Sequence, residues 1–344
     1  MTKRHVSAGR ILFILAMLAM AAMPLSALAE TNCSASLSSI DFGTVVPGQD
    51  ATVNADISYE CETAVPAFAA SETVVRMCIA IGPGTAPGST VASRRMASGT
   101  PGASPLAFQL YRDAAELQAW GDSPSGAITW HPIQLRYPIQ SFIGIGGTGR
   151  ASGTARIRGR VPAQALLRPG DYLAAFPDAR LVFRYTDVWP WPAPGSCQSG
   201  GTGGSVFLFS FSAHANVASR CTVQAGPLHF GDVPGLVTRA RDQSALVELE
   251  CTPGTAYQVG LDPGRHAAGG VRRMRHASGG EHVAYALYRD PARTLPWGAT
   301  PDVDTVAGTG TGAAQRLTVH GRIPAGQVAP AGSYSDVVTV TVSY

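Results

Sequence analysis

Lysine is almost absent from this chain: Lys3 is the single lysine among 344 residues, and charged residues make up 14% of the sequence. Residues 1–29 contain three of the 26 Lys and Arg and no acidic residue, so the rest of the chain balances 23 basic against 23 acidic side chains. Proteins that bind nucleic acid or anionic membranes through charge need a basic patch. The neutral balance therefore excludes nucleic acid as an expected partner.

Motifs for catalysis and cofactor binding are also missing. No Gly-x-Ser-x-Gly elbow occurs, and pairing of all six cysteines leaves no free thiol nucleophile. The letters GIGGTG at 144–149 match a dinucleotide fingerprint, but no helical pattern follows to hold a pyrophosphate, which favours a glycine-rich loop. His266, His276 and His282 lack close ligand spacing, which favours solvated histidines over a metal site. We expect no enzymatic activity, no metal and no cofactor.

Long apolar runs are confined to the N-terminus. ILFILAMLAMAAM, from Ile11, is shorter than the roughly 20 residues of a membrane span, follows basic residues and precedes a small-x-small site at Ala27–Ala29. This pattern predicts a cleaved signal peptide over 1–29, with an uncleaved anchor as the less favoured alternative. All six cysteines lie in the exported part, which fits an oxidising compartment where disulfides persist.

The sequence does contain an internal repeat. CSASLSSIDFGTV from Cys33 matches CTVQAGPLHFGDV from Cys221, and RRM, LYRD and WG recur in the same order within 94–121 and 272–298. Both copies alternate period-2 runs rich in Val, Thr and aromatics with Gly/Pro turns, and they lack amphipathic helical windows. We therefore expect an all-β protein of two antiparallel β-sandwiches, the first with inserted residues. Because RRM recurs in both copies, a structural role such as a turn is favoured over an anion site.

The repeat also suggests how the cysteines pair. Two pairs stand at matching positions in the two copies, and the remaining two cysteines have no counterpart, so they would close a long loop in the first copy. Six cysteines allow many connectivities, and only the repeat selects this one. The predicted disulfides are Cys33–Cys61, Cys221–Cys251 and Cys78–Cys197.

These motifs resemble the spore coat protein U domain, which occurs in subunits of archaic, Csu-type chaperone-usher pili. The order Cys, FG, Cys, RRM, LYRD, WG, GR-[VI]-P, G-[DS]-Y and VTVTVSY is followed closely in 221–344 and with interruptions in 33–185. The resemblance implies an immunoglobulin-like sandwich that lacks its last strand. It also implies a periplasmic chaperone that first fills the gap, an outer-membrane usher, and an adjacent subunit whose N-terminal extension finally fills it.

A strand-like segment, SVFLFSFSAHANV at 205–217, stands where such an extension would precede the second copy. Its alternate residues Phe207, Phe209, Phe211 and Ala213 suit a strand that covers an open core. We expect this segment to complete the first copy in cis and to bury the three phenylalanines. An ordinary last strand is the alternative, and the aromatic alternation argues against a flexible linker.

The second copy has no such segment after it, so we expect it to need a partner's strand. Only Glu30–Asn32 separate the predicted cleavage site from Cys33, which is too short for an outward donor strand. A subunit that accepts a strand but donates none can occupy only the end of a fibre. The predicted parts are a signal peptide (1–29), an N-terminal adhesin domain (30–204), a connecting strand (205–219) and a C-terminal pilin domain (220–344).

We therefore expect a tip adhesin at the cell surface that attaches cells to abiotic or hydrophobic surfaces during biofilm formation. The alternatives are a structural shaft or coat subunit without recognition, and a secreted lectin-like module. Apolar stretches at 62–72, 128–147 and 187–195, absent from the second copy, form the candidate adhesive surface, unless the alternation at 133–137 marks a core strand. The candidate surface residues are Val65, Phe68, Trp130, Ile133, Tyr137, Ile139, Phe142, Ile143, Trp189 and Trp191.

Overall fold

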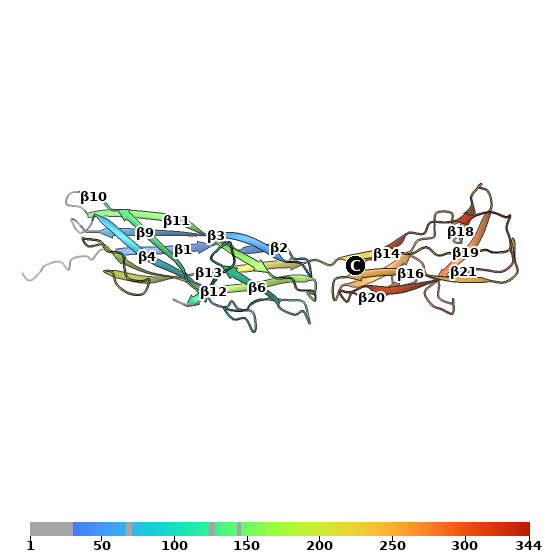
Figure 1. The fold of residues 1–344 in the computed structure, drawn as a ribbon, viewed down its shortest axis with the longest axis horizontal. Helices are drawn as coiled ribbons and strands as arrows, with labels where there is room; N and C mark the ends of the chain where they lie inside the picture. The colour runs from blue at the N-terminus through green and yellow to red at the C-terminus, as the bar shows by residue number, and fades with distance from the viewer. Residues whose placement is uncertain (1–29, 67–70, 124–127, 143–145) are drawn as a thin grey trace, which may run out of the picture.

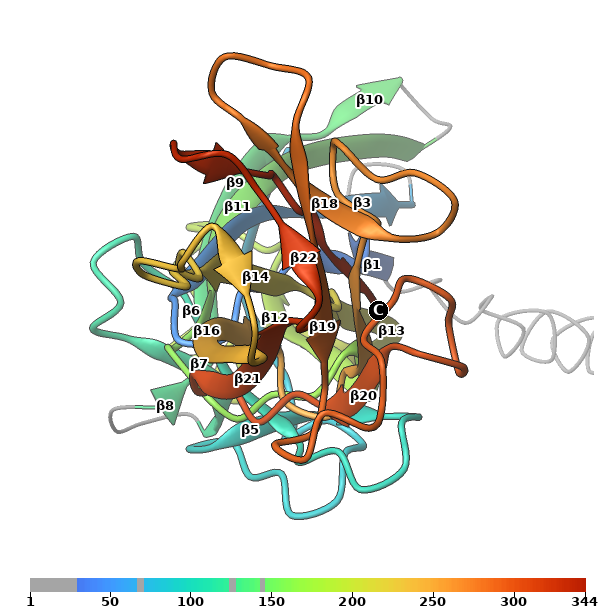
Figure 2. The same cartoon turned by 90° about the vertical axis from the view of Figure 1, so that its right-hand side faces the viewer.

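The computed structural model describes residues 30–66, 71–123, 128–142 and 146–344. It consists of two β domains that follow each other along the long axis of the molecule (Figure 1), and the end-on view has domain 2 in front of domain 1 (Figure 2). We call residues 30–217 domain 1 and residues 221–344 domain 2. The described residues form no helix, and so none that could cross a membrane. The predicted signal peptide lies outside the described residues.

Domain 1 is a sandwich of two β layers. One layer has the order β1-β3-β11-β6, the other the order β9-β4-β12-β13-β2, and β5 links them through β6 and β12. Strands β3 and β11 stay in register from Val65 opposite Gly147 to Ala51 opposite Val161. The strands are β1 (Glu30–Leu37), β2 (Ile40–Thr44), β3 (Ala51–Val65), β4 (Glu72–Ala80), β5 (Arg94–Ser98), β6 (Leu106–Tyr111), β7 (Ala119–Ser123), β8 (Ile128–Thr129), β9 (His131–Pro138), β10 (Gln140–Phe142), β11 (Gly146–Val161), β12 (Gly170–Thr186) and β13 (Gly203–Val217).

Domain 2 repeats this plan with shorter strands. Its larger sheet has the order β14-β16-β21-β19-β18-β23, a second sheet has the order β20-β17-β24, and β15 pairs with β22. The strands are β14 (Cys221–Ala225), β15 (Leu236–Val237), β16 (Arg241–Cys251), β17 (Ala256–Leu261), β18 (Arg272–His276), β19 (His282–Tyr288), β20 (Val306–Thr309), β21 (Gln315–Ile323), β22 (Gln327–Val328), β23 (Tyr334–Ser335) and β24 (Val340–Ser343).

Alternation along the strands builds the two cores. In β1 every second side chain is buried, and the residues between them face solvent. Each domain also buries one tryptophan whose Nε1 donates to a strand carbonyl at 2.8 Å: Trp120 to Ile79 in domain 1, and Trp297 to Val259 in domain 2. The prediction of two antiparallel β-sandwiches, drawn from the repeat, is confirmed.

The first arginine of each RRM motif has a structural role. Arg94 is fully buried and donates to the carbonyl of Gly82, and Arg272 donates in the same way to the carbonyl of Asp262. Burial lowers the pKa of Arg94 to about 10. The guanidinium holds the end of a core strand in both domains, which explains why the motif recurs.

All six cysteines form disulfides, in the pairing that the repeat predicts. Cys33 lies directly opposite Cys61 on β1 and β3, and Cys221 lies opposite Cys251 on β14 and β16. The third disulfide, Cys78–Cys197, ties the segment that follows β12 to β4. It anchors a loop that the second domain does not have.

Candidate functional site

Strand β13 lies between β12 and β2, in the second layer of domain 1. It pairs antiparallel with β12 from Gly170 opposite Val217 to Tyr185 opposite Gly203, with a register shift between Phe176 and Ala179. It also runs parallel to β2 near Ala213 and His214. The segment before domain 2 is therefore a full member of the domain 1 sheet.

The C-terminal half of β13 fills the core of domain 1. Ala213, Ala215 and Val217 are buried, and the ring of Phe211 stacks on Phe176 at 4.5 Å between ring centroids. The Phe211 ring also lies parallel to Trp120 at 6.1 Å. Aromatic pairs of this kind add to the stabilisation from buried area.

The N-terminal half of β13 contributes less than predicted. Phe209 is only partly buried, and Phe207 is 37% exposed, so the expectation that all three phenylalanines are buried is wrong for Phe207. The reason is that β2 pairs with β13 only near Ala213–Asn216. Phe207 lies beyond this cover, on a part of β13 that pairs with β12 alone.

Domain 2 has a groove where domain 1 has β13. Leu228 and Phe230 match Ile40 and Phe42 of β2, and Gly43 and Gly231, which follow, both adopt positive φ. Between residues 228–230 and the strand edge at 334–340, the described residues form no strand, and a cavity of ≈ 560 Å³ opens instead.

The walls of this groove are largely apolar. The ring of Phe230 meets Tyr285 at 6.3 Å, but Leu228 and Phe230 are only partly buried, whereas Ile40 is 1% exposed in domain 1. We call this cavity the domain 2 groove. Its apolar lining is Leu228, Phe230, Val247, Leu261, Met274, Leu287, Val319, Val338 and Val340, and its polar lining includes Tyr285, Tyr334 and Asp336.

The strand at the groove edge is interrupted. Its counterpart β12 is continuous, but β23 and β24 are separated by residues 336–339, which belong to no strand. On the side away from the groove, Arg265 donates its N–H to the carbonyl of Val337, and Asp262 donates to the carbonyl of Thr339. Extended backbone at an open sheet edge can pair with a strand from another chain. The domain 2 groove thus combines an apolar floor with such an edge.

The structure divides the ten predicted surface residues. Trp189 is 77% exposed, and Trp191 and Ile133 are partly buried, whereas Phe68 and Ile143, like the Phe142 side chain, lie outside the described part. Exposure is wrongly predicted for the four others, because their side chains are packed inside domain 1. These are Val65, Trp130, Tyr137 and Ile139, each at most 7% exposed. Tyr137 is typical: its hydroxyl lies 2.7 Å from Thr63 Oγ1, and burial raises its pKa.

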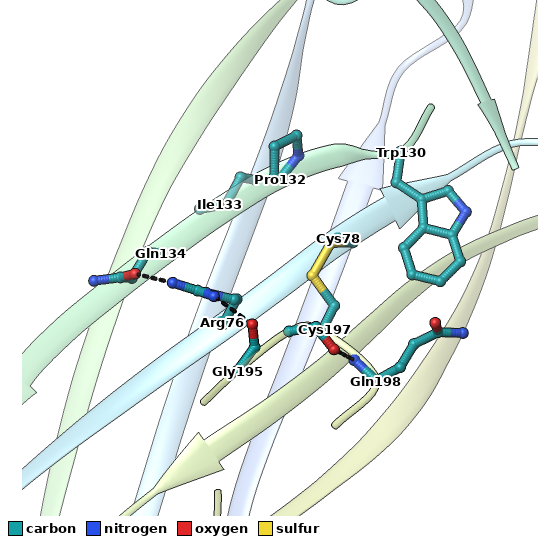
Figure 3. Close-up of a pocket in the computed structure, with 10 residues that line it drawn as sticks. Arg76, Cys78, Trp130, Pro132, Ile133, Gln134, Gly195, Cys197 and Gln198 are labelled. Atoms are coloured by element: carbon teal, nitrogen blue, oxygen red, sulfur yellow. Dashed lines mark hydrogen bonds between the residues drawn. A yellow bond between two sulfur atoms is a disulfide. The ribbon is translucent and has the colours of Figure 1, made fainter. Parts of the chain in front are cut away.

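The exposed Trp189 sits in a loop that is held at several points. Arg136 donates to the carbonyl of Trp191, and Arg76 donates to the carbonyl of Gly195 at 2.7 Å (Figure 3). Next to these bonds, the Cys78–Cys197 disulfide and Trp130 line a shallow pocket of ≈ 400 Å³. These contacts fix the loop, so we call it the braced loop. It joins β12 to β13 at the end of domain 1 away from domain 2.

Sequence reasoning missed the residues that line the groove. The signal was present, since LHF at 228–230 aligns with IDF at 40–42 in the repeat. In the described part of the chain, no group of three or more His, Cys, Asp or Glu side chains could hold a metal ion. The groove and the braced loop are the two candidate sites.

Comparison with known sequences gives a family match. The family model of the Spore Coat Protein U domain matches residues 19–175 and 207–341. Protein U of Myxococcus xanthus is 29% identical over 145 residues, which is 38% of this chain and 80% of that protein.

Two solved structures are similar at low identity. One is the CsuC-CsuE chaperone-tip adhesion subunit pre-assembly complex from archaic chaperone-usher Csu pili of Acinetobacter baumannii, with a TM-score of 0.49 and 14% identity, covering 90% of this chain and 100% of that chain. The other is the CupB6 tip adhesin from Pseudomonas aeruginosa, with a TM-score of 0.35 and 14% identity, covering 92% and 94%.

The packing of β13 predicts an unequal effect of its phenylalanines. Phe211→Ala leaves a cavity between Phe176 and Trp120, so we expect it to lower the free energy of unfolding of domain 1 by about 3–5 kcal/mol. Phe207→Ala, the matched control, should cost less than about 1 kcal/mol because its ring is partly solvated. Urea denaturation of the full chain measures both, and equal costs would contradict the packing.

Proposed function

Because the chain belongs to the Spore Coat Protein U domain family, we propose that it is a chaperone-usher pilus subunit that sits at the fibre tip and attaches cells to surfaces. The observation that carries this proposal is the contrast between two repeats of one fold. Domain 1 contains its own completing strand, β13, and domain 2 presents a groove at the same position. Domain 2 therefore joins the fibre by accepting a strand from the adjacent subunit.

The physical properties of the groove support this mode of assembly. An extended segment with alternate apolar residues can pair with the free backbone edge and cover the apolar floor at the same time. Until that strand arrives, the groove exposes apolar side chains to water, at a cost that grows with area. A periplasmic chaperone would cover the groove in transit, and an outer-membrane usher would pass the subunit into the fibre.

The pairing of β13 supports the terminal position. This strand stands in front of domain 2, where an extension offered to a neighbour would stand, but it is hydrogen-bonded to β12 along its length. It is therefore already paired within its own chain. The chain receives a strand at domain 2 and leaves domain 1 at the free end of the fibre.

Attachment is assigned to the end of domain 1 remote from domain 2. The Trp189 indole projects there from a loop braced by the Cys78–Cys197 disulfide and by Arg136. A rigid exposed aromatic can lose its water against any apolar surface with little loss of conformational entropy. This chemistry suits hydrophobic or abiotic surfaces and the first step of biofilm formation.

Assembly depends on the floor of the groove. Phe230→Asp would place a carboxylate beneath the incoming strand, where burying the charge without a hydrogen-bond or ion-pair partner is costly. We therefore expect the amount of the chain in pili to fall at least about tenfold. Val328→Asp, on an exposed side chain of β22, is the matched control. Immunodetection of the chain in sheared pili gives the readout, and resistance of domain 2 to limited proteolysis reports whether it is folded. Normal incorporation of the Phe230 variant would count against the proposal.

Adhesion depends on the exposed loop. Trp189→Ala should reduce attachment of piliated cells to polystyrene several-fold and leave the number of pili unchanged, because the side chain is solvated and supports no core. Leu166→Ala is the control, since Leu166 is 70% exposed but lies on the loop before β12, at the opposite end of domain 1. Unchanged attachment of the Trp189 variant would favour a structural subunit without a recognition role.

A further inference from the structure

The domain 2 groove differs from its filled counterpart at three positions that meet in space. In domain 1 all three positions are apolar and buried, whereas in domain 2 all three are polar, and two of them hydrogen-bond to the third. We call the second set the polar trio. The polar trio is His266, Tyr285 and Asp336, and the matching residues of domain 1 are Ala86, Phe108 and Ala174.

Strand register and backbone hydrogen bonds establish this match. The first arginine of RRM lies opposite Phe108 in domain 1 and opposite Tyr285 in domain 2. Next to Ala86 and Ala174, Thr85 donates its N–H to the carbonyl of Ala175 at 3.0 Å. Next to His266 and Asp336, Arg265 donates its N–H to the carbonyl of Val337 at the same distance. The three replacements thus occupy one place in the fold.

Asp336 is the centre of the trio. Its Oδ2 accepts a 2.7 Å hydrogen bond from the Tyr285 hydroxyl, and its Oδ1 lies 3.0 Å from Nδ1 and 3.2 Å from the backbone N of His266. The carboxyl group is 2% exposed although it lines the groove. Burial and the bond to Asp336 raise the pKa of Tyr285, so the phenol stays protonated and donates. Domain 2 therefore keeps a buried acceptor under the groove.

The β12–β13 pairing predicts what comes to lie beside this acceptor. Ala213 stands directly opposite Ala174, and both are fully buried. A strand that fills the domain 2 groove in the same register places one residue opposite Asp336, with Cβ atoms about 4.5–5.5 Å apart. A small side chain with a hydroxyl group can then donate to a free lone pair of the carboxyl group. A bulky apolar side chain would displace water from the carboxyl group without offering a hydrogen bond in its place. The negative charge of an acidic side chain would be repelled by the carboxyl group.

We propose that the polar trio selects the partner strand by demanding serine or threonine opposite Asp336. This inference rests on the proposed function, in which domain 2 accepts a strand. The occupant is an extended segment of another subunit. It carries larger apolar side chains two and four residues before the hydroxyl residue, as Phe209 and Phe211 precede Ala213 in β13. These side chains would lie over Val338 and Val340, which line the groove.

Synthetic peptides test the selection on the full-length chain. The parent peptide has the sequence of residues 205–217, and three versions carry Ala213→Ser, Ala213→Leu or Ala213→Asp. Because β13 is part of the chain and already fills domain 1, the peptides can bind only in the domain 2 groove. Phe230→Asp in the protein checks this, since it should weaken peptide binding at that groove. We expect the serine peptide to bind about tenfold more tightly than the parent, the equivalent of one hydrogen bond to a charged group. The leucine and aspartate peptides should bind more weakly than the parent.

Two protein variants test whether the polar trio causes the preference for serine. Asp336→Ala installs the domain 1 residue and should reduce the preference for serine over alanine to less than about twofold. Tyr285→Phe removes one donor to Asp336 and should enlarge that preference, because the carboxyl group then gains more from a new donor. This second variant keeps the test decisive if Asp336→Ala does not fold.

The outcomes separate the selection from strand acceptance itself. Equal affinity of the four peptides for the wild-type chain, or an unchanged serine preference in the folded variants, would overturn the selection and leave strand acceptance standing. Binding of no peptide to a chain whose domain 2 is folded would overturn both.

Discussion

An unpaired sheet edge over an apolar core is the constraint on which this structure depends. A sandwich that lacks one strand leaves backbone N–H and C=O groups and core side chains exposed together. Domain 1 meets the constraint internally, because β13 pairs with β12 and inserts Phe211, Ala213, Ala215 and Val217 into the core. Domain 2 repeats the fold without such a strand and keeps the groove. The proposed function follows from that one difference.

The connection between the domains gives the in-cis strand a mechanical consequence. β13 ends at Val217 and β14 begins at Cys221, and Thr252 Oγ1 hydrogen-bonds to the short link at Ala218 and Arg220. Tension applied through domain 2 therefore acts along β13, parallel to the strand. Its hydrogen bonds to β12 are then loaded together rather than one after another.

Much of the fold could be predicted because the repeat made two copies comparable. It predicted the three disulfides. Together with the family resemblance, it also predicted that 205–217 lies against the first copy, and β13 does pair with β12 there. Alternation alone does not say which face of an inserted strand is inward, and so the burial of Tyr137 on β9 could not be predicted. The polar trio was beyond sequence reasoning, because His266 and Asp336 lie in two segments outside the strands. A backbone hydrogen bond from Arg265 to the carbonyl of Val337 holds these segments together. Predictions from pattern succeed where the repeat fixes the register and fail where packing decides the face.

Amide hydrogen exchange on the isolated full-length chain tests the central claim most directly. The measurement compares matched segments of the two domains: 40–42 with 228–230, and 174–176 with 336–338. If β13 completes domain 1 and the domain 2 groove is open, the domain 2 amides should exchange at least about a hundredfold faster. The reason is that the free energy of local opening is near zero at an exposed edge, so its amides have little protection. They should become protected when a strand peptide binds. Equal protection of the matched segments in the isolated chain would contradict the account.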